Sequence, residues 1–270
     1  MKIPFIKMNG LGNDFIILED LSKNLPLNKA LLKKMSSRQY GIGCDQILII
    51  KKFEGDQAHV DIYNNDGSIV GACGNGVRCV ASYLMEKELF DRIFIRTIEG
   101  KLECWKENNN ISVNMGKPKF NPNEIPLVED VKETQFQLEG FKINCVSFGN
   151  PHGVIFFKNL KELEKINVLN VGPLLEKNQI FLEGANIEFA TILEDGSIRM
   201  KVWERGAGMT LACGSGACAT LVIAVKLKLS KRKNRLVLDG GDLFINWQED
   251  NDVIMTGEVE KVFEGNFYVT

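Results

Sequence analysis

Two cysteines stand in nearly identical segments of the sequence, 140 residues apart, and their surroundings suit acid–base chemistry. The segments are Ala72-Cys73-Gly74-Asn75-Gly76 and Ala212-Cys213-Gly214-Ser215-Gly216. Residues 77–88 and 217–229, which follow them, have the pattern of helices. A thiol just ahead of a helix N-terminus is where its pKa is most readily lowered, and free N–H groups there bind anions. The pairing predicts a single site, built symmetrically around one substrate.

Such a doubled loop supplies a base, an acid and an anion-binding site. Its glycines let backbone N–H groups approach a ligand closely, and the helix ends stabilise a carboxylate that becomes enolate-like. A cysteine, with an ordinary pKa of about 8.5, can serve as base or acid once that pKa is brought toward neutrality. Two thiols on opposite faces of a Cα atom suit inversion of configuration, because a thiolate removes one proton and a thiol returns another. We therefore expect Cys73 and Cys213 to be catalytic.

Other uses of these cysteines have weaker support. A single loop of this kind would suit a capped turn or a nucleophilic cysteine, but a nucleophile needs a general-base histidine. The chain has only His59 and His152. His59 lies in an alternating, strand-like segment and suits a structural role, whereas His152 follows Gly149-Asn-Pro and suits lining the site. No metal site is predicted, because Cys73 and Cys79 lack a matching pair at zinc-finger spacing.

The repeat extends beyond the cysteines and divides the chain into two halves. Residues 12–15 (GNDF) parallel 149–152 (GNPH), and the offset of the two cysteines also relates Gln46 to Asn186. Residues 117–126 contain three prolines and have the composition of a connector. We predict domains at 1–116 and 117–257, with 258–270 returning to the first. Short strands outnumber helices, so each domain should be β-rich with one buried helix.

Polar residues in repeat-related loops suit an amino-acid ligand. Side-chain amides donate to carboxylates and accept from ammonium groups, and Arg205 can bind a carboxylate through two hydrogen bonds. Taken singly, each asparagine suits a turn as well as a ligand contact. The candidate binding residues are Asn13, Gln46, Asn64, Asn150, Asn186, Glu204 and Arg205.

Composition excludes several other classes of protein. The 270 residues are 44% hydrophobic and 25% charged, as in globular proteins. A net charge of −2, from 33 Lys+Arg and 35 Asp+Glu, gives no electrostatic basis for nucleic-acid binding. No apolar run approaches the roughly 18 residues of a membrane span, and no signal peptide is recognisable. Seven cysteines, an odd number, argue against a disulfide framework, so we expect a cytoplasmic protein with reduced thiols.

Six segments together resemble the diaminopimelate epimerase family, and the resemblance covers nearly the whole chain. They are 8–15 (MNGLGNDF), 64–67 (NNDG), 73–79 (CGNGVRC), 149–152 (GNPH), 204–208 (ERGAG) and 212–218 (ACGSGAC). The resemblance implies an α/β (α+β) protein of two pseudo-symmetric domains, each a curled sheet wrapped around a central helix. It implies that Cys73 and Cys213 are the two bases. It further implies that the α-carboxylate is held by Gly74, Asn75, Gly214 and Ser215, and the rest of the substrate by the seven residues given above.

The function implied by this resemblance is the epimerisation of LL-diaminopimelate to the meso form, a step of lysine biosynthesis that also supplies a peptidoglycan precursor. It requires no cofactor, and the family is usually a homodimer. One alternative keeps the two-thiol mechanism on another amino acid, such as histidine or lanthionine. Two further alternatives are an isomerase of the same fold that acts on a substrate other than an amino acid, and a non-enzymatic ligand-binding module. The retained Arg205 favours a substrate with a second carboxylate.

Overall fold

The computed structural model describes residues 1–71 and 73–269, so Ala72 of the first cysteine segment and Thr270 of the returning segment lie outside the described residues. The chain folds into two compact units: unit 1 is Met1–Asn114 with Thr256–Thr270, and unit 2 is Met115–Met255. The chain passes between the units after residues 114 and 255. Each of these boundaries lies two residues before the one expected from the sequence repeat, at 116 and 257. Within the described residues, none of the helices combines the length and hydrophobicity of a membrane span.

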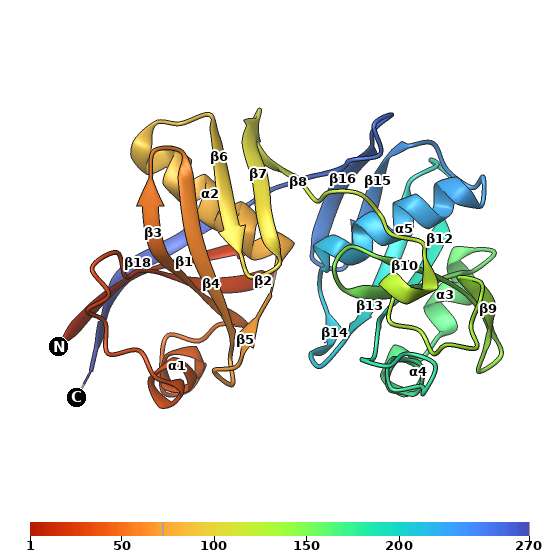
Figure 1. Ribbon diagram of the computed structural model, residues 1–270, viewed down its shortest axis with the longest axis horizontal. Coiled ribbons are helices and arrows are strands. Elements are labelled where there is room, and N and C mark those ends of the chain that lie inside the picture. The colour runs from red at the N-terminus through yellow and green to blue at the C-terminus, as the bar shows by residue number, and fades with distance from the viewer. Residues whose placement is uncertain (72, 270) are drawn as a thin grey trace. The chain divides into compact units, whose positions relative to one another are not determined.

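Unit 1 is a long, curled sheet with one helix against its concave face. Its elements are β1 (Lys2–Gly10), β2 (Asn13–Glu19), α1 (Lys29–Ser36), β3 (Gln46–Glu54), β4 (Gln57–Asn64), β5 (Ile69–Val70), α2 (Gly74–Glu88), β6 (Arg92–Thr97), β7 (Gly100–Glu107), β8 (Asn110–Asn114) and β18 (Glu260–Tyr268). The strands are paired in the order β18-β1-β2-β3-β4-β6-β7-β8, with β5 also beside β4. Figure 1 shows α2 running through the middle of this unit, where it contacts strands from both ends of the sheet.

Unit 2 repeats this plan. Its elements are η1 (Pro122–Glu124), β9 (Gln135–Leu138), β10 (Phe141–Ser147), β11 (Pro151–Phe156), α3 (Leu160–Lys165), α4 (Val168–Glu176), β12 (Asn186–Ile192), β13 (Ile198–Glu204), β14 (Gly208–Thr210), α5 (Gly214–Lys226), β15 (Lys233–Leu238), β16 (Gly241–Trp247) and β17 (Val253–Gly257), in which the chain returns to unit 1. The strand order β9-β10-β11-β12-β13-β15-β16 matches that of unit 1, with β14 in the place of β5.

Two parallel steps interrupt each otherwise antiparallel sheet, and they decide where the cysteines lie. In unit 1 the parallel pairs are β2–β3 and β4–β6, and in unit 2 they are β11–β12 and β13–β15. A parallel pair requires a crossover connection, usually a helix. The crossover from β4 to β6 contains α2, and the one from β13 to β15 contains α5. Each cysteine therefore stands at the start of a crossover helix.

The two crossover helices are buried because the sheets curl around them. On α5, apolar residues such as Leu221, Val222 and Ala224 are almost fully buried, and so is Thr220. A helix that is hydrophobic on nearly all sides is typical of a protein core. On α2, Val77, Val80 and Leu84 are equally buried. Both units are therefore α+β, each with a central helix that is buried along most of its length.

Candidate active site

Cys73 and Cys213 are the N-cap residues of α2 and α5. Both have extended backbones, with φ of −151° and −125°, and the helices begin at Gly74 and Gly214. The sequence pattern placed the helix starts at 77 and 217, which was wrong by three residues, because the Gly-rich segments form the first turns rather than loops. The two thiols therefore lie at the positive ends of helix dipoles. In unit 1, the Gly76 N–H donates to Cys73 Sγ at 3.4 Å.

Asn13 is the candidate binding residue that contacts the first thiol. Its Oδ1 lies 3.9 Å from Cys73 Sγ, the long end of the range for a thiol donor. Its other amide atom, Nδ2, donates to Asp45 Oδ2 at 2.8 Å. This second bond determines the orientation of the amide, because a carboxylate only accepts hydrogen bonds. The Asn13 carbonyl oxygen is consequently directed to the thiol.

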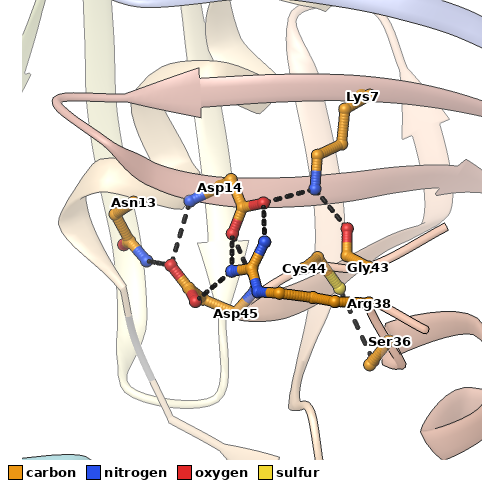
Figure 2. Close-up of polar contacts among 8 residues, drawn as sticks. All are labelled: Lys7, Asn13, Asp14, Ser36, Arg38, Gly43, Cys44 and Asp45. Atoms are coloured by element: carbon orange, nitrogen blue, oxygen red, sulfur yellow. Dashed lines mark hydrogen bonds and ion pairs between the residues drawn. The ribbon is translucent and has the colours of Figure 1, made fainter.

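A cluster of charges holds Asn13 in this place (Figure 2). Arg38 donates to both oxygens of Asp14, at 2.8 and 2.7 Å, and to Asp45 at 2.8 Å. Lys7 forms an ion pair of 2.5 Å with Asp14 from the neighbouring strand β1. Although burial would raise the pKa of Asp14, the hydrogen bonds from Arg38 and Lys7 outweigh it and lower that pKa to about 2. The cluster joins the start of β2 to the loop before β3.

Gln46 and Asn64, two further candidate binding residues of unit 1, are hydrogen-bonded to each other. They lie directly opposite each other on β3 and β4, and Gln46 Nε2 donates to Asn64 Oδ1 at 3.0 Å. Asn64 Nδ2 in turn donates to Ser68 Oγ at 3.2 Å. Asn75, in the first turn of α2, is 2% exposed. The structure therefore joins Gln46 to Asn64, and Asn13 to Cys73, as two sets of contacts.

In unit 2 a line of side chains leads from the second thiol into the core. Cys213 Sγ lies 3.7 Å from Ser215 Oγ, to which Asn150 Nδ2 donates at 3.3 Å. Asn150 Oδ1 contacts His152 Nε2 at 3.0 Å, and His152 Nδ1 contacts Glu188 Oε1 at 2.7 Å. His152, expected to line the site, is fully buried and stands behind Asn150. Four sequence-predicted residues, Cys213, Ser215, Asn150 and His152, are therefore brought together by contacts within one unit.

Glu188 was missed by the sequence reasoning. It is two residues after Asn186 in β12, and alternate residues of a strand share a face. A signal for it was present in the sequence: a single acidic residue stands between Ile187 and Phe189 in an otherwise apolar strand. Because an unpaired buried carboxylate is costly, such a residue requires a partner.

The thiol of Cys213 departs from the expectation of a lowered pKa. Burial, followed by the charges of Glu204 and Glu188, raises its pKa well above the ordinary value. The side chain is 5% exposed, so desolvation outweighs the helix dipole. Glu204 accepts a hydrogen bond from Thr210 and one from the Cys213 thiol, while burial raises the pKa of this carboxyl group as well. Cys213 therefore favours the protonated form, which is the form of an acid.

Asn186 and Arg205, two other candidate binding residues, contact the protein itself. Asn186 Nδ2 donates to Pro151 O at 3.1 Å, and its Oδ1 accepts from the Arg205 N–H at 3.0 Å. Asn186 thus ties the start of β11 to the turn at 205–207. The Arg205 guanidinium group is about one-third exposed and lies 3.6 Å from the Glu183 carboxylate. That exposed pair contributes little to stability, so the guanidinium group can exchange partners.

Glu176 anchors the same turn and was also missed. Its Oε1 accepts from the Gly206 N–H at 2.9 Å, and its Oε2 accepts from Trp203 Nε1 at 2.7 Å. Glu176 is the last residue of α4 and is 7% exposed. Nothing in the local sequence distinguishes it from Glu162 and Glu164 of α3, because the contact depends on the packing of α4 on β13.

This fold occurs in solved structures with very different sequences. A phenazine biosynthesis protein of the PhzF family from Enterococcus faecalis aligns with a TM-score of 0.69 and 14% identity, covering 100% of both chains. A hydroxyproline epimerase from Agrobacterium vitis, solved with bound trans-4-hydroxy-L-proline, aligns with a TM-score of 0.68 and 12% identity, covering 98% of this chain and 92% of that one. The fold class is therefore the two-domain curled sheet with central helices, seen in isomerases and related proteins.

The sequence places the chain within this class. The family model for diaminopimelate epimerase matches residues 5–121 and 144–262. A diaminopimelate epimerase from Acidiphilium cryptum is 42% identical over 266 residues, 97% of this chain and 95% of that protein. One from Carboxydothermus hydrogenoformans is 39% identical over 277 residues, covering 99% and 100%. The chain belongs to the diaminopimelate epimerase family, whose members are isomerases that work without pyridoxal phosphate.

Proposed function

We propose that this protein converts LL-diaminopimelate to meso-diaminopimelate by a two-thiol mechanism. Family membership supports the reaction. The observation that carries the mechanism is the equivalence of the two cysteines: each is the N-cap of the crossover helix in its own unit. Equivalent positions in a duplicated fold suit equivalent roles on the two faces of one carbon atom.

The proton transfers balance without a further reactant. The thiolate of one cysteine takes the α proton and becomes a thiol, leaving the electron pair on Cα as an enolate-like anion. The thiol of the other cysteine then gives its proton to the opposite face and becomes a thiolate. Proton exchange of the two cysteines with solvent restores the starting thiolate and thiol. The raised pKa of Cys213 makes this residue the thiol in the resting enzyme, with Cys73 the base that begins the cycle. The reverse reaction uses the same steps in the opposite order.

The remaining site residues have binding roles in this proposal. The α-carboxylate accepts hydrogen bonds from the first turns of α2 and α5, at Gly74, Asn75, Gly214 and Ser215, because the N-terminus of a helix is a site for anions. The same dipoles stabilise the added charge of the enolate-like anion. Arg205, by leaving Glu183, binds the distal carboxylate. Asn13 orients the Cys73 thiol, and Asn186 positions the turn that presents Arg205.

The distal carboxylate separates this substrate from histidine but not from lanthionine. Lanthionine has the same two amino-acid ends as diaminopimelate, whereas histidine has no second carboxylate.

We propose that the substrate is a free amino acid, that no cofactor takes part, and that the protein acts in the cytoplasm as a homodimer, as the family pattern implies. Sedimentation velocity would test the dimer directly.

Exchange of the α proton with solvent tests the proposed reaction. The purified protein is placed in D₂O with a reductant, and deuterium at Cα is followed by NMR for LL-diaminopimelate, L-lanthionine and L-histidine. We expect exchange with diaminopimelate and its conversion to the meso form in the wild-type protein, and loss of that conversion in both Cys73→Ser and Cys213→Ser. Cys145→Ala is the matched control, because Cys145 is buried outside the two repeated segments. Preferred exchange with histidine or lanthionine would contradict the proposed substrate, and formation of the meso form by either serine variant would contradict the two-thiol mechanism.

A further inference from the structure

Glu188 is a charged residue placed in the interior of unit 2 without an evident structural need. It is 0% exposed and belongs to β12, whose other residues are mostly apolar. One carboxylate oxygen, Oε1, contacts His152 Nδ1 at 2.7 Å. The other, Oε2, is buried with no hydrogen-bond partner within residues 1–71 and 73–269. A half-satisfied buried carboxylate destabilises a core, so its presence indicates a functional role.

The carboxylate of Glu188 also lies against the first turn of α5. A Cβ atom on Gly216 would come within 2.7 Å of Glu188 Oε1 and 3.3 Å of Cys213 Cβ. Real Cβ atoms do not approach other atoms at 2.7 Å, so the glycine at 216 is required by the closeness of this carboxylate. The same geometry places Glu188 directly behind the catalytic cysteine, at the positive end of the helix.

His152 transmits the position of Glu188 to the helix N-terminus. One ring nitrogen contacts Glu188, and the other contacts Asn150, whose amide nitrogen donates to Ser215 Oγ at 3.3 Å. Because His152 is fully buried, its ring orientation is determined by these two contacts. A carboxylate can only accept, so Nδ1 must carry a proton when Glu188 is ionised.

Cys213 is faced by charged or titratable groups from three strands. Glu188 approaches from β12 and Glu204 from β13, and His152 lies behind Glu188 on β11. The two carboxylates add to the effect of burial in raising the pKa of Cys213. Removal of either charge should therefore increase the fraction of thiolate at this cysteine.

We propose that Glu188 is a positioning residue for Cys213: it fixes the ring and the Nδ1 proton of His152, and its charge keeps the neighbouring cysteine in its thiol form. Glu188 does not touch the substrate and acts only through His152 and Cys213. This inference rests on the proposed function for the catalytic role of Cys213. A purely structural Glu188–His152 pair would give stability alone, without an effect on the thiol.

The test compares Glu188→Gln with the wild-type protein by two measurements that need no substrate. The first is the rate of iodoacetamide modification of Cys213, followed by peptide mass spectrometry, with Cys73 in the same sample as the internal reference. We expect Cys213 modification at pH 8 to be at least threefold faster in Glu188→Gln, with Cys73 changed by less than twofold. An unchanged ratio of the two rates would overturn the proposed effect on the thiol.

The second measurement is the imidazole ¹⁵N–¹H NMR spectrum, which is simple because the chain has only His59 and His152. His59 is exposed on β4 and serves as the reference. A protected Nδ1–H signal from His152 should be present in the wild-type protein, shifted in Glu188→Gln and absent in Glu188→Ala. The same signal in all three proteins would show that Glu188 does not hold this proton.

Steady-state kinetics then tests the role in the reaction. We expect kcat of Glu188→Gln to fall about tenfold, with KM changed by less than twofold, because no substrate contact is removed. Asp20→Asn is the control, since Asp20 is also a buried carboxylate with one main partner, Lys51, in the other unit. A kcat within twofold of wild type would overturn the proposal. Absence of α-proton exchange in the wild-type protein would instead contradict the proposed function, while the thiol and NMR measurements would still decide the role of Glu188.

Discussion

Asp14 and Asp45 each accept a hydrogen bond from the backbone N–H of the other residue, at 3.0 and 3.1 Å. This reciprocal arrangement ties the first residues of β2 to the residue preceding β3. Arg38 completes it by donating to both carboxylates. Asn13 adjoins Asp14 in sequence and is bonded to Asp45, so its place beside Cys73 depends on this cluster.

Replacing Arg38 by Gln should impair catalysis more than stability. Loss of the guanidinium group leaves two carboxylates close together, which then repel each other and loosen Asn13. We expect kcat/KM to fall about tenfold and the free energy of unfolding by about 1 kcal/mol, measured by proton-exchange kinetics and urea denaturation.

Arg92→Gln is the matched control for Arg38→Gln, because Arg92 has the same side-chain exposure of 61% and pairs with Glu103 in the same unit. Equal losses of activity in the two variants would show that the Asp14–Arg38–Asp45 cluster has no special role.

The stability of the protein should decrease in acid over a defined range. The pKa of Asp14 is lowered from 3.8 to about 2 in the folded state. A lowered folded-state pKa contributes stability that is complete above the unfolded value and is lost as the pH falls through the folded value. The free energy of unfolding should therefore fall between about pH 4 and pH 2, by about 1–2 kcal/mol from this group. Urea denaturation at closely spaced pH values measures it.

The variant Asp14→Asn should show a smaller decrease than the wild-type protein across this pH range, because the titrating group is gone. A curve of the same slope would assign the acid sensitivity to other carboxylates. Glu54→Gln is a suitable control, since Glu54 is an exposed carboxylate that pairs with Lys52 at the surface of the same unit.

Alanine at the two equivalent helix glycines should have unequal effects. At Gly216 a Cβ atom would meet the Glu188 carboxylate at 2.7 Å, whereas at Gly76 it would meet Leu48 methyl groups at 3.0 and 3.2 Å. A leucine side chain can shift by a few tenths of an ångström, but the carboxylate is held by His152. We expect Gly216→Ala to lower the free energy of unfolding by about 2 kcal/mol more than Gly76→Ala, measured by thermal and urea denaturation. Equal losses would mean that Glu188 moves freely.

The charge of Glu204 should also control Cys213. Its carboxylate is among the causes that raise the pKa of this thiol, after burial. Glu204→Gln should therefore increase the rate of Cys213 alkylation at pH 8, since removing a nearby negative charge lowers the thiol pKa. Thr210→Val leaves the charge in place and removes only the hydroxyl donor to Glu204. An equal increase in both variants would attribute the effect to loosened packing rather than to charge.

The sequence by itself determined the duplicated plan, the two cysteines and the family. These are local properties: Cys73 and Cys213 are recognisable because glycines follow them and a helical pattern comes next, and some strands, such as β6, show their own alternation. The expected division of the chain at 116 and 257 came from the same repeat, which is visible without any knowledge of contacts.

Only the tertiary structure decided what surrounds each thiol. Glu188 and His152 are 36 positions apart in the chain, and the parallel pairing of β11 with β12 brings them together, a pairing that no local pattern specifies. The expectation of a lowered pKa considered the helix dipole alone, and for Cys213 it was wrong because burial and two carboxylates act in the opposite direction. Charge and desolvation depend on all the atoms packed around a group, and that packing exists only once the sheet has curled around its helix.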